Sequence, residues 1–244
     1  MVIRPVIVLL LAFPAALGGT PWDKPPEKWS LSDVYRILED SPWSPADVKL
    51  EVKGAGRQEN SQTGMVTNDS PMDSNTSNTV PGVQLSQGTK PRAGVPVLWW
   101  SSKTVRLAEQ RLLQSRDPAA ASQPLHAEEL PDYVLVVEGS EPLRILQDAK
   151  DDLHDTVFLE LPNGVSLDFE SVRFAERNAN VEPHVEFHFP RQVDGQPTID
   201  PDAERVIFHC KAVAKTAHPY ENNTLSLRAE FKPKNMRVRG TPDL

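Results

Sequence analysis

Residues 54–96 limit the possible folds of this chain because they contain almost no bulky apolar side chains. The stretch consists mainly of Gly, Ser, Thr, Asn, Gln and Pro, and such a composition cannot bury enough surface to offset the entropy lost on ordering. We therefore predict a disordered polar insertion over residues 54–96. One helix and one strand in residues 19–53 are too little to fold alone, so we expect them to join residues 97–244 in a single domain.

Residues 1–18 have the order of features found in a cleavable secretion signal. Arg4 supplies a positive charge, residues 6–12 are apolar, and Pro14 interrupts the run ahead of small residues; this order is typical of a secretory signal. The competing interpretation is an uncleaved membrane anchor, but the apolar run is shorter than the roughly 20 residues of a spanning helix. We expect cleavage near Gly18 and an exported protein, periplasmic or secreted, without a stable membrane span.

Charge and cysteine content exclude several classes of protein. The formal net charge is −8, and no basic cluster offsets it, so phosphate groups would be repelled and a nucleic-acid partner is not expected. Cys210 is the only cysteine, which excludes a secreted module held together by internal disulfides. Cys210 falls on the inward face of a predicted strand, where burial raises the pKa of a thiol and makes it a poor nucleophile.

Two helices in the N-terminal half are predicted from capping residues and apolar spacing. Ser30 followed by Asp33 is typical of a helix start, because both side chains can accept hydrogen bonds from backbone amides. Ser102 predicts the start of a second helix over residues 103–115, in which Glu109 falls on the solvent side. A third, weaker helix is predicted over residues 143–153.

The C-terminal half shows the alternation expected of antiparallel strands. Residues 157–161 and 165–169 flank Asn163-Gly164, and an Asn-Gly pair between two strand patterns is a strong hairpin signal. Residues 133–137 are uniformly apolar, which indicates a central strand. Further strands are predicted over residues 184–189, 205–211 and 225–231.

The order of these elements indicates the fold class. We expect residues 48–52 to form a strand that pairs with residues 95–100 across the polar insertion. With two or three helices early and strands late, the sequence predicts an α+β domain with a mostly antiparallel sheet in its C-terminal half.

Several short segments of this chain resemble segments of a group of exported bacterial proteins. The segments are KPPEKW (residues 24–29), ILEDSPW (37–43), WWSS (99–102), VEFHFPR (185–191) and FKPKNM (231–236). They are similar to an uncharacterised group typical of acidobacteria, which has no assigned activity. The resemblance implies bacterial export and implies no particular chemistry.

The best candidate ligand set lies on the strand over residues 184–189. Residues two apart on a strand project to one face, so Glu182, His184, Glu186 and His188 would share it. His209 would join them if its strand lay beside this one. Imidazole and carboxylate groups suit zinc. The alternative is that these side chains form the ordinary solvent-facing side of a strand whose other side is buried.

Two functional hypotheses follow. The first is a non-enzymatic binding or structural module of the bacterial cell envelope without a cofactor, which binds an envelope or extracellular protein at an edge strand or near Trp29 and Trp43. Those tryptophans are expected to attach the first helix to the core, with ligand stacking as the alternative. The second is a metal-binding protein or metal-dependent hydrolase with zinc held by the histidine set. It requires the strand of His209 to lie beside that of His184.

Overall fold

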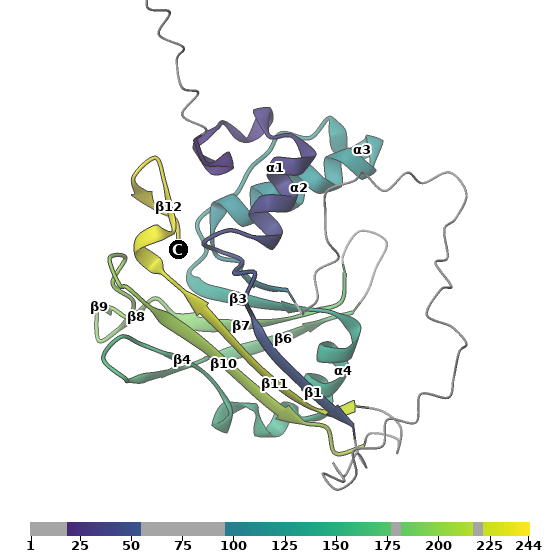
Figure 1. Cartoon of the computed structure of the whole chain (residues 1–244), viewed down its shortest axis with the longest axis vertical. Helices are drawn as coiled ribbons and strands as arrows, with labels where there is room; N and C mark the ends of the chain where they lie inside the picture. Colours follow the sequence, from purple (N-terminus) through teal and green to yellow (C-terminus); the bar gives the residue numbers. More distant parts are fainter. Residues whose placement is uncertain (1–18, 55–95, 177–181, 217–221) are drawn as a thin grey trace, which may run out of the picture.

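The computed structural model describes residues 19–54, 96–176, 182–216 and 222–244. Two antiparallel sheets form the centre of the molecule, and a group of helices lies at one end of them (Figure 1). Most strands belong to the C-terminal half, so the predicted α+β class is confirmed. The predicted signal over residues 1–18 and nearly all of the predicted insertion over residues 54–96 lie outside the described residues.

The larger sheet has five strands. They are β1 (Lys49–Gly54), β4 (Val157–Glu160), β5 (Ser166–Asp168), β10 (Val206–Val213) and β11 (Asn222–Phe231), in the order β1-β11-β10-β4-β5. The hairpin predicted at Asn163-Gly164 is confirmed, because β4 and β5 pair across it. Gly164 has a φ of 79°, a conformation that glycine adopts without a steric penalty.

The smaller sheet has four strands. They are β2 (Val97–Trp99), β3 (Asp132–Glu138), β7 (His184–Pro190) and β6 (Ser171–Ala175), in that order across the sheet. β3 lies between β2 and β7, which confirms the predicted central strand. The predicted pairing of residues 48–52 with 95–100 is wrong, since β1 pairs with β11 and β2 with β3. The two segments flank the insertion in the sequence, but each pairs with a strand that comes later in the chain.

The core between the two sheets is aromatic. Phe187 and Phe189 on β7 point toward Phe208 on β10, with ring centroids 5.6 and 6.3 Å apart, and all three side chains are fully buried. Such interdigitation of inward-facing residues is how two sheets bury a common core. Cys210 lies on the same face as Phe208, and burial raises the pKa of its thiol to about 12. The predicted inward position of Cys210 is therefore confirmed.

Two of the helices begin where the capping residues predict. They are α1 (Leu31–Glu39), α2 (Lys103–Arg116), α3 (Pro118–Ala121) and α4 (Ser140–Asp148), with 3-10 turns η1 (Pro21–Asp23), η2 (Pro26–Lys28), η3 (Lys150–Asp155) and η4 (Pro233–Asn235). Ser30 caps α1 in a reciprocal capping box with Asp33, and Ser102 caps α2. The predicted third helix forms as two pieces, α4 and η3.

The helices lie on two sides of the sheets. α1, α2 and α3 lie together at one end, and α4 lies apart from them (Figure 1). α4 contacts β3 and β7 of the smaller sheet and β10 and β11 of the larger one, so it packs against both sheets. Within the described ranges, no helix has the length and apolar character needed to span a bilayer.

Two short hairpins complete the fold. β8 (Gln192–Val193) pairs with β9 (Gln196–Pro197), and β12 (Arg237–Val238) pairs with β13 (Thr241–Pro242). The chain that follows β13 returns to the helical end of the molecule, where Asp243 and Trp43 are joined by a hydrogen bond. This brings the C-terminal segment beside the N-terminal helices.

Candidate functional site

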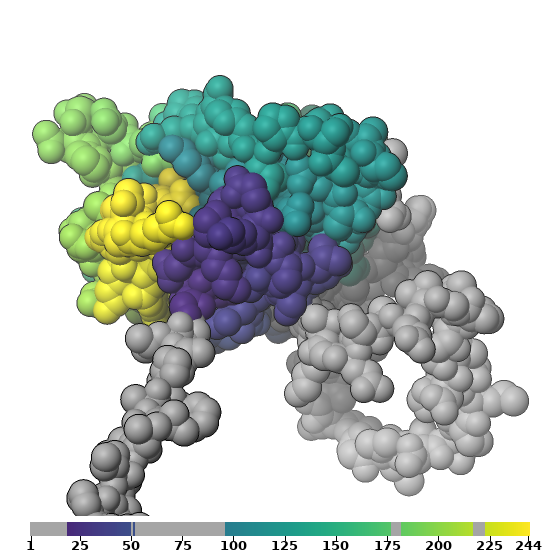
Figure 2. All heavy atoms as spheres, turned by 90° about the horizontal axis from the view of Figure 1, so that it is seen from above, coloured from purple at the N-terminus to yellow at the C-terminus, as the bar shows by residue number. Residues whose placement is uncertain are grey.

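A cavity of about 680 Å³ is lined by four distant parts of the chain: the N-terminal segment, the region of α2, residues 191–201 and the C-terminal segment. The N-terminal segment (purple), the region of α2 (teal) and the C-terminal segment (yellow) lie side by side on one face in Figure 2. The lining includes three aromatic residues, four basic residues and several prolines and aliphatic residues, among them Trp22, Trp29, Tyr133, Lys24, Lys103, Arg191, Arg239, Pro25, Pro26, Leu107, Ile199, Val238 and Leu244. The volume falls within the roughly 300–1,000 Å³ of small-molecule sites.

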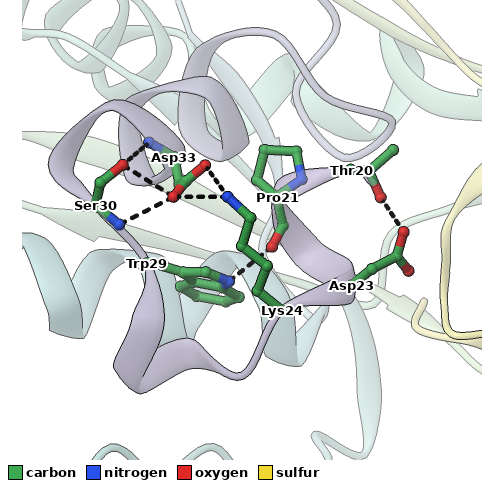
Figure 3. A network of polar contacts seen from close by, with 7 residues as sticks. All are labelled: Thr20, Pro21, Asp23, Lys24, Trp29, Ser30 and Asp33. Carbon is green, nitrogen blue, oxygen red and sulfur yellow. Dashed lines mark hydrogen bonds and ion pairs between the residues drawn. The ribbon is translucent and has the colours of Figure 1, made fainter. Parts of the chain in front are cut away.

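The N-terminal wall of the cavity is held by a polar network (Figure 3). Trp29 donates its indole N–H to the carbonyl of Pro21 at 2.9 Å, and Lys24 contacts the carboxylate of Asp33 at 3.0 Å. Burial raises the pKa of Asp33, but hydrogen bonds from Ser30 and Lys24 outweigh it and leave the pKa below its usual value. The same carboxylate thus completes the capping box of α1 and anchors the cavity wall.

Trp22 and Trp43 connect this wall to the core. Their rings pack edge to face with centroids 5.3 Å apart, and Trp43 is fully buried while Trp29 is 3% exposed. The predicted role of Trp29 and Trp43 in attaching the first helix is confirmed. Trp29 lines the cavity and Trp43 does not. Ligand stacking, the alternative role predicted for both, is therefore possible for Trp29, and also for Trp22, which lines the cavity too.

The C-terminal wall is held by Asp243. Its carboxylate accepts hydrogen bonds from the Ser102 hydroxyl at 2.8 Å and from the backbone amides of Lys103 and Thr104 at 2.8 and 3.0 Å. These amides belong to the first turn of α2, where backbone N–H groups lack partners within the helix and favour negative charge. Asp243 therefore supplements the predicted Ser102 cap from the far end of the chain.

Arg191 and Tyr133 also line the cavity and contact each other. The guanidinium of Arg191 lies 4.4 Å from the centroid of the Tyr133 ring, a cation–π distance. Arg191 also donates to the carbonyl oxygen of Leu130 at 3.0 Å and to a main-chain oxygen of Leu244, the last residue of the sequence, at 2.7 Å. Burial raises the pKa of the Tyr133 hydroxyl, although Arg191 acts in the opposite direction.

The basic residues of the lining outnumber the acidic ones. Lys24, Lys103, Arg191 and Arg239 line the cavity, against the carboxylates of Glu129 and Asp243. Lys24 is paired with Asp33, and Arg239 contacts Asp23, so part of this positive charge is already balanced by carboxylates next to the lining. Apolar walls with a few placed polar groups are typical of small-molecule sites.

Comparisons of the chain with protein-family models, with curated proteins and with solved structures gave no match. The resemblance to exported bacterial proteins therefore stays a prediction from short segments.

The predicted strand histidines form a different site on the outer face of the smaller sheet. His184, Glu186 and His188 share that face, opposite the buried phenylalanines of β7. The ring Nε2 of His184 lies 2.9 Å from one oxygen of Glu186, and that of His188 lies 3.5 Å from the other. Arg173 on β6 binds both oxygens of Glu186, at 2.8 Å through its Nε.

The carboxylate of Glu186 is paired with the basic groups around it. Burial raises the pKa of Glu186, but His184 and Arg173 lower it more, to about 2. His184 has a raised pKa because of its hydrogen bond to Glu186, despite the opposing effect of burial.

Glu109 on α2 is half-buried, whereas the sequence predicts that it faces solvent. Burial raises the pKa of the Glu109 carboxyl, and the positive charges of Arg116 and His184 act in the opposite direction.

His209 does not join this cluster. It lies on β10 in the larger sheet, while His184 and His188 lie on β7 in the smaller one. Its ring stacks on Phe158 at 4.8 Å and contacts Glu160 at 2.9 Å. The predicted metal set that includes His209 requires β10 to lie beside β7, and it is therefore wrong, because β10 pairs with β4 and β11.

The remaining three residues do not form an evident metal site. Within the part of the chain that the structure describes, no group of three His, Cys, Asp or Glu side chains is placed to hold a metal ion. Both carboxylate oxygens of Glu186 are used by Arg173 and the histidines. The cavity, of whose lining the sequence predicts only Trp29 as a ligand contact, is the better candidate site.

Proposed function

We propose that this protein is a non-enzymatic binding module whose site is the cavity between the N-terminal segment, α2 and the C-terminal segment. The observation that carries the proposal is the cavity itself, at about 680 Å³ with aromatic, proline and aliphatic walls. Binding sites for small molecules combine such walls with a few placed polar groups. The aromatic and basic residues of the lining match that description.

The roles of the charged lining residues favour binding over catalysis. Asp243 accepts three hydrogen bonds at the start of α2, and Lys24 is paired with Asp33. A general acid or base needs a proton or lone pair that can reach the substrate. These groups instead hold the walls of the cavity in place, which preserves its shape.

The proposal includes export from the cytoplasm to a periplasm or to the exterior. Its support is the order of charge, apolar run and small residues over residues 1–18. We favour a small organic ligand over an envelope protein as the partner, because the best-formed recognition surface is concave.

A blocked cavity tests the proposal. Thr241 is exposed at the cavity wall, so Thr241→Trp would fill the space with little disturbance of the core. Val193 on the β8–β9 hairpin is 49% exposed and does not line the cavity, which makes Val193→Trp the matched control.

A library of small organic molecules would be screened by saturation-transfer NMR against the three proteins. We expect compounds that bind the natural protein and the Val193→Trp control, and that lose binding to Thr241→Trp. Failure to find any bound compound, or binding that is unchanged by Thr241→Trp in a folded protein, would refute the proposed function.

A further inference from the structure

We infer that the cavity binds uncharged, largely apolar molecules, and that a carbonyl or hydroxyl group of the ligand pairs with the hydroxyl of Ser101. The inference rests on the proposed function and adds the chemical class of the ligand. Its basis is that the charged groups of the lining already have partners within the protein, whereas one buried polar group of the lining has none.

Two cations of the lining are engaged by residues of the N-terminal wall. Lys24 contacts the carboxylate of Asp33 at 3.0 Å. Arg239 donates through Nε to the carbonyl oxygen of Asp23 at 3.0 Å and through its backbone amide to the Asp23 carboxylate at 3.3 Å. A ligand anion near either cation would compete with oxygen atoms that the fold already places there.

Arg191 is engaged by three groups of the protein. Its guanidinium donates to the carbonyl oxygen of Leu130 at 3.0 Å and to a main-chain oxygen of Leu244 at 2.7 Å. It also lies 4.4 Å from the centroid of the Tyr133 ring, within cation–π range. A move toward a ligand would break these contacts, so Arg191 holds the wall of the cavity in place.

The carboxylates of the lining are engaged as well. Asp243 accepts three hydrogen bonds at the start of α2, and Glu129 lies 3.9 Å from the ammonium group of Lys103. The Lys103–Glu129 pair is the weakest of these contacts, because it is long and its side chains are 48% and 73% exposed. A charged ligand group would therefore lose its water without meeting an unpaired opposite charge.

Ser101 differs from the charged residues of the lining. It is 2% exposed, and its hydroxyl oxygen is a buried polar atom without a hydrogen-bond partner in the part of the chain that the structure describes. A buried polar group without a partner costs free energy, and a hydroxyl can both donate and accept. A ligand carbonyl or hydroxyl at Ser101 would remove that cost without introducing a charge.

The rest of the lining suits the apolar body of such a ligand. Trp22, Trp29, Ile199 and Val238 supply aromatic and aliphatic surface, and burial of apolar surface contributes to affinity in proportion to its area. The volume of about 680 Å³ is that of a site for a small organic molecule. The ligand class is therefore an uncharged apolar molecule with at least one hydrogen-bonding group.

Three compounds that carry different groups at the same position of a naphthalene ring test the inference. At pH 7 naphthalene carboxamide is uncharged, naphthoate is an anion of nearly the same shape, and naphthylmethylammonium is a cation. Their dissociation constants would be measured by NMR titration for the natural protein and for Thr241→Trp. We expect the carboxamide to bind the natural protein about tenfold or more tightly than either charged compound, and to lose affinity in Thr241→Trp.

A variant that unpairs one cation tests why the charged compounds are rejected. Glu129→Gln removes the partner of Lys103, so we expect affinity for naphthoate to rise about threefold or more. Affinity for the carboxamide should change by less than about twofold. Glu204→Gln is the matched control, because Glu204 is 77% exposed and pairs with Lys234, and neither residue lines the cavity.

A second variant tests the contact assigned to Ser101. Ser101→Ala removes a hydroxyl that has no partner among the described residues, so the protein should fold without loss of stability. We expect the variant to weaken binding of naphthalene carboxamide about threefold or more, as for loss of one hydrogen bond. Its affinity for naphthalene itself, which has no polar group, should stay unchanged.

The outcomes separate this inference from the proposed function. Charged compounds that bind the cavity as tightly as the carboxamide, or a carboxamide affinity unchanged by Ser101→Ala, would overturn the inference and leave the binding function standing. If none of the three compounds binds, the compounds found by the library screen decide: mainly charged ones overturn the inference, and uncharged ones that Ser101→Ala weakens support it. A screen without any bound compound refutes the proposed function and the inference together.

Discussion

Asp243 acts at the scale of a single residue, yet it joins the C-terminal segment to α2. We expect Asp243→Ala to lower the free energy of unfolding by about 1–2 kcal/mol, because two amides and one hydroxyl at the helix start lose their acceptor. Asp243→Asn should cost less, since asparagine also caps helices. Urea denaturation of the three proteins measures this; an alanine variant as stable as the natural protein would contradict the assigned role.

Glu186 and His184 make stability depend on pH in two directions. The pKa of Glu186 falls from 4.5 to about 2 on folding, so its contribution is present above pH 4.5 and is lost as the pH falls toward 2. The pKa of His184 is raised above 6.5, so its contribution is present below pH 6.5 and is lost as the pH rises through the folded-state value. Both contributions are complete only between pH 4.5 and 6.5.

We therefore expect the stability difference between the natural protein and Glu186→Gln to be largest near pH 5.5. It should shrink toward pH 2 as the carboxylate is protonated. At pH 8 it should be smaller than at pH 5.5 but not absent, because Arg173 still pairs with Glu186. Denaturant unfolding at pH 2.5, 5.5 and 8 checks this, and a difference that does not vary with pH would contradict the described cluster.

Cys210 should be chemically silent while the protein is folded. Its thiol is buried, and its pKa of about 12 leaves almost no thiolate at neutral pH. We expect maleimide labelling only after the protein is unfolded in urea. Rapid labelling of the native protein would show that the inward face of β10 is accessible.

Much at the residue scale could be predicted from neighbours in sequence. The Ser30–Asp33 capping box and the burial of Cys210 depend on local patterns, and the structure confirms both. The bidentate contact of Arg173 with Glu186 could not be predicted, because it depends on the register of β6 against β7. The Asp243 cap was equally hidden, since its partners lie about 140 positions away.

At the scale of elements, the hairpin between β4 and β5 depends on Gly164. Its φ is 79°, and a side chain there would meet no atom within 4 Å. Any cost of Gly164→Ala is thus conformational, about 1 kcal/mol or somewhat more. Gly19→Ala, at a glycine whose φ is not in the left-handed region, is the control. Thermal unfolding that leaves both variants equal would contradict the tight turn.

Elements with local signals were predictable, whereas their partners were not. The central strand β3 and the start of α2 follow from an apolar run and a capping serine. The pairing of β1 with β11 brings together segments at opposite ends of the chain. Alternating patterns show which face of a strand is buried, but they do not specify which strand lies beside it.

At the scale of the whole molecule, the cavity arises because four segments distant in sequence meet, namely the N-terminal segment, the region of α2, residues 191–201 and the C-terminal segment. Trp22 and Trp29 come from the first thirty residues of the sequence, Arg191 follows β7, and Asp243 lies in the C-terminal segment. Residues of one site that are so widely separated leave no spacing pattern in the sequence. This is why the tryptophans could be singled out from sequence but the basic side of the same cavity could not.

The most direct test is a calorimetric titration of a compound found by the library screen into the natural protein and into Thr241→Trp. We predict saturable binding of one compound per protein molecule, weakened by about tenfold or more when the tryptophan fills the cavity. Equal affinity for the two folded proteins would show that the cavity between the N-terminal segment, α2 and the C-terminal segment is not the binding site.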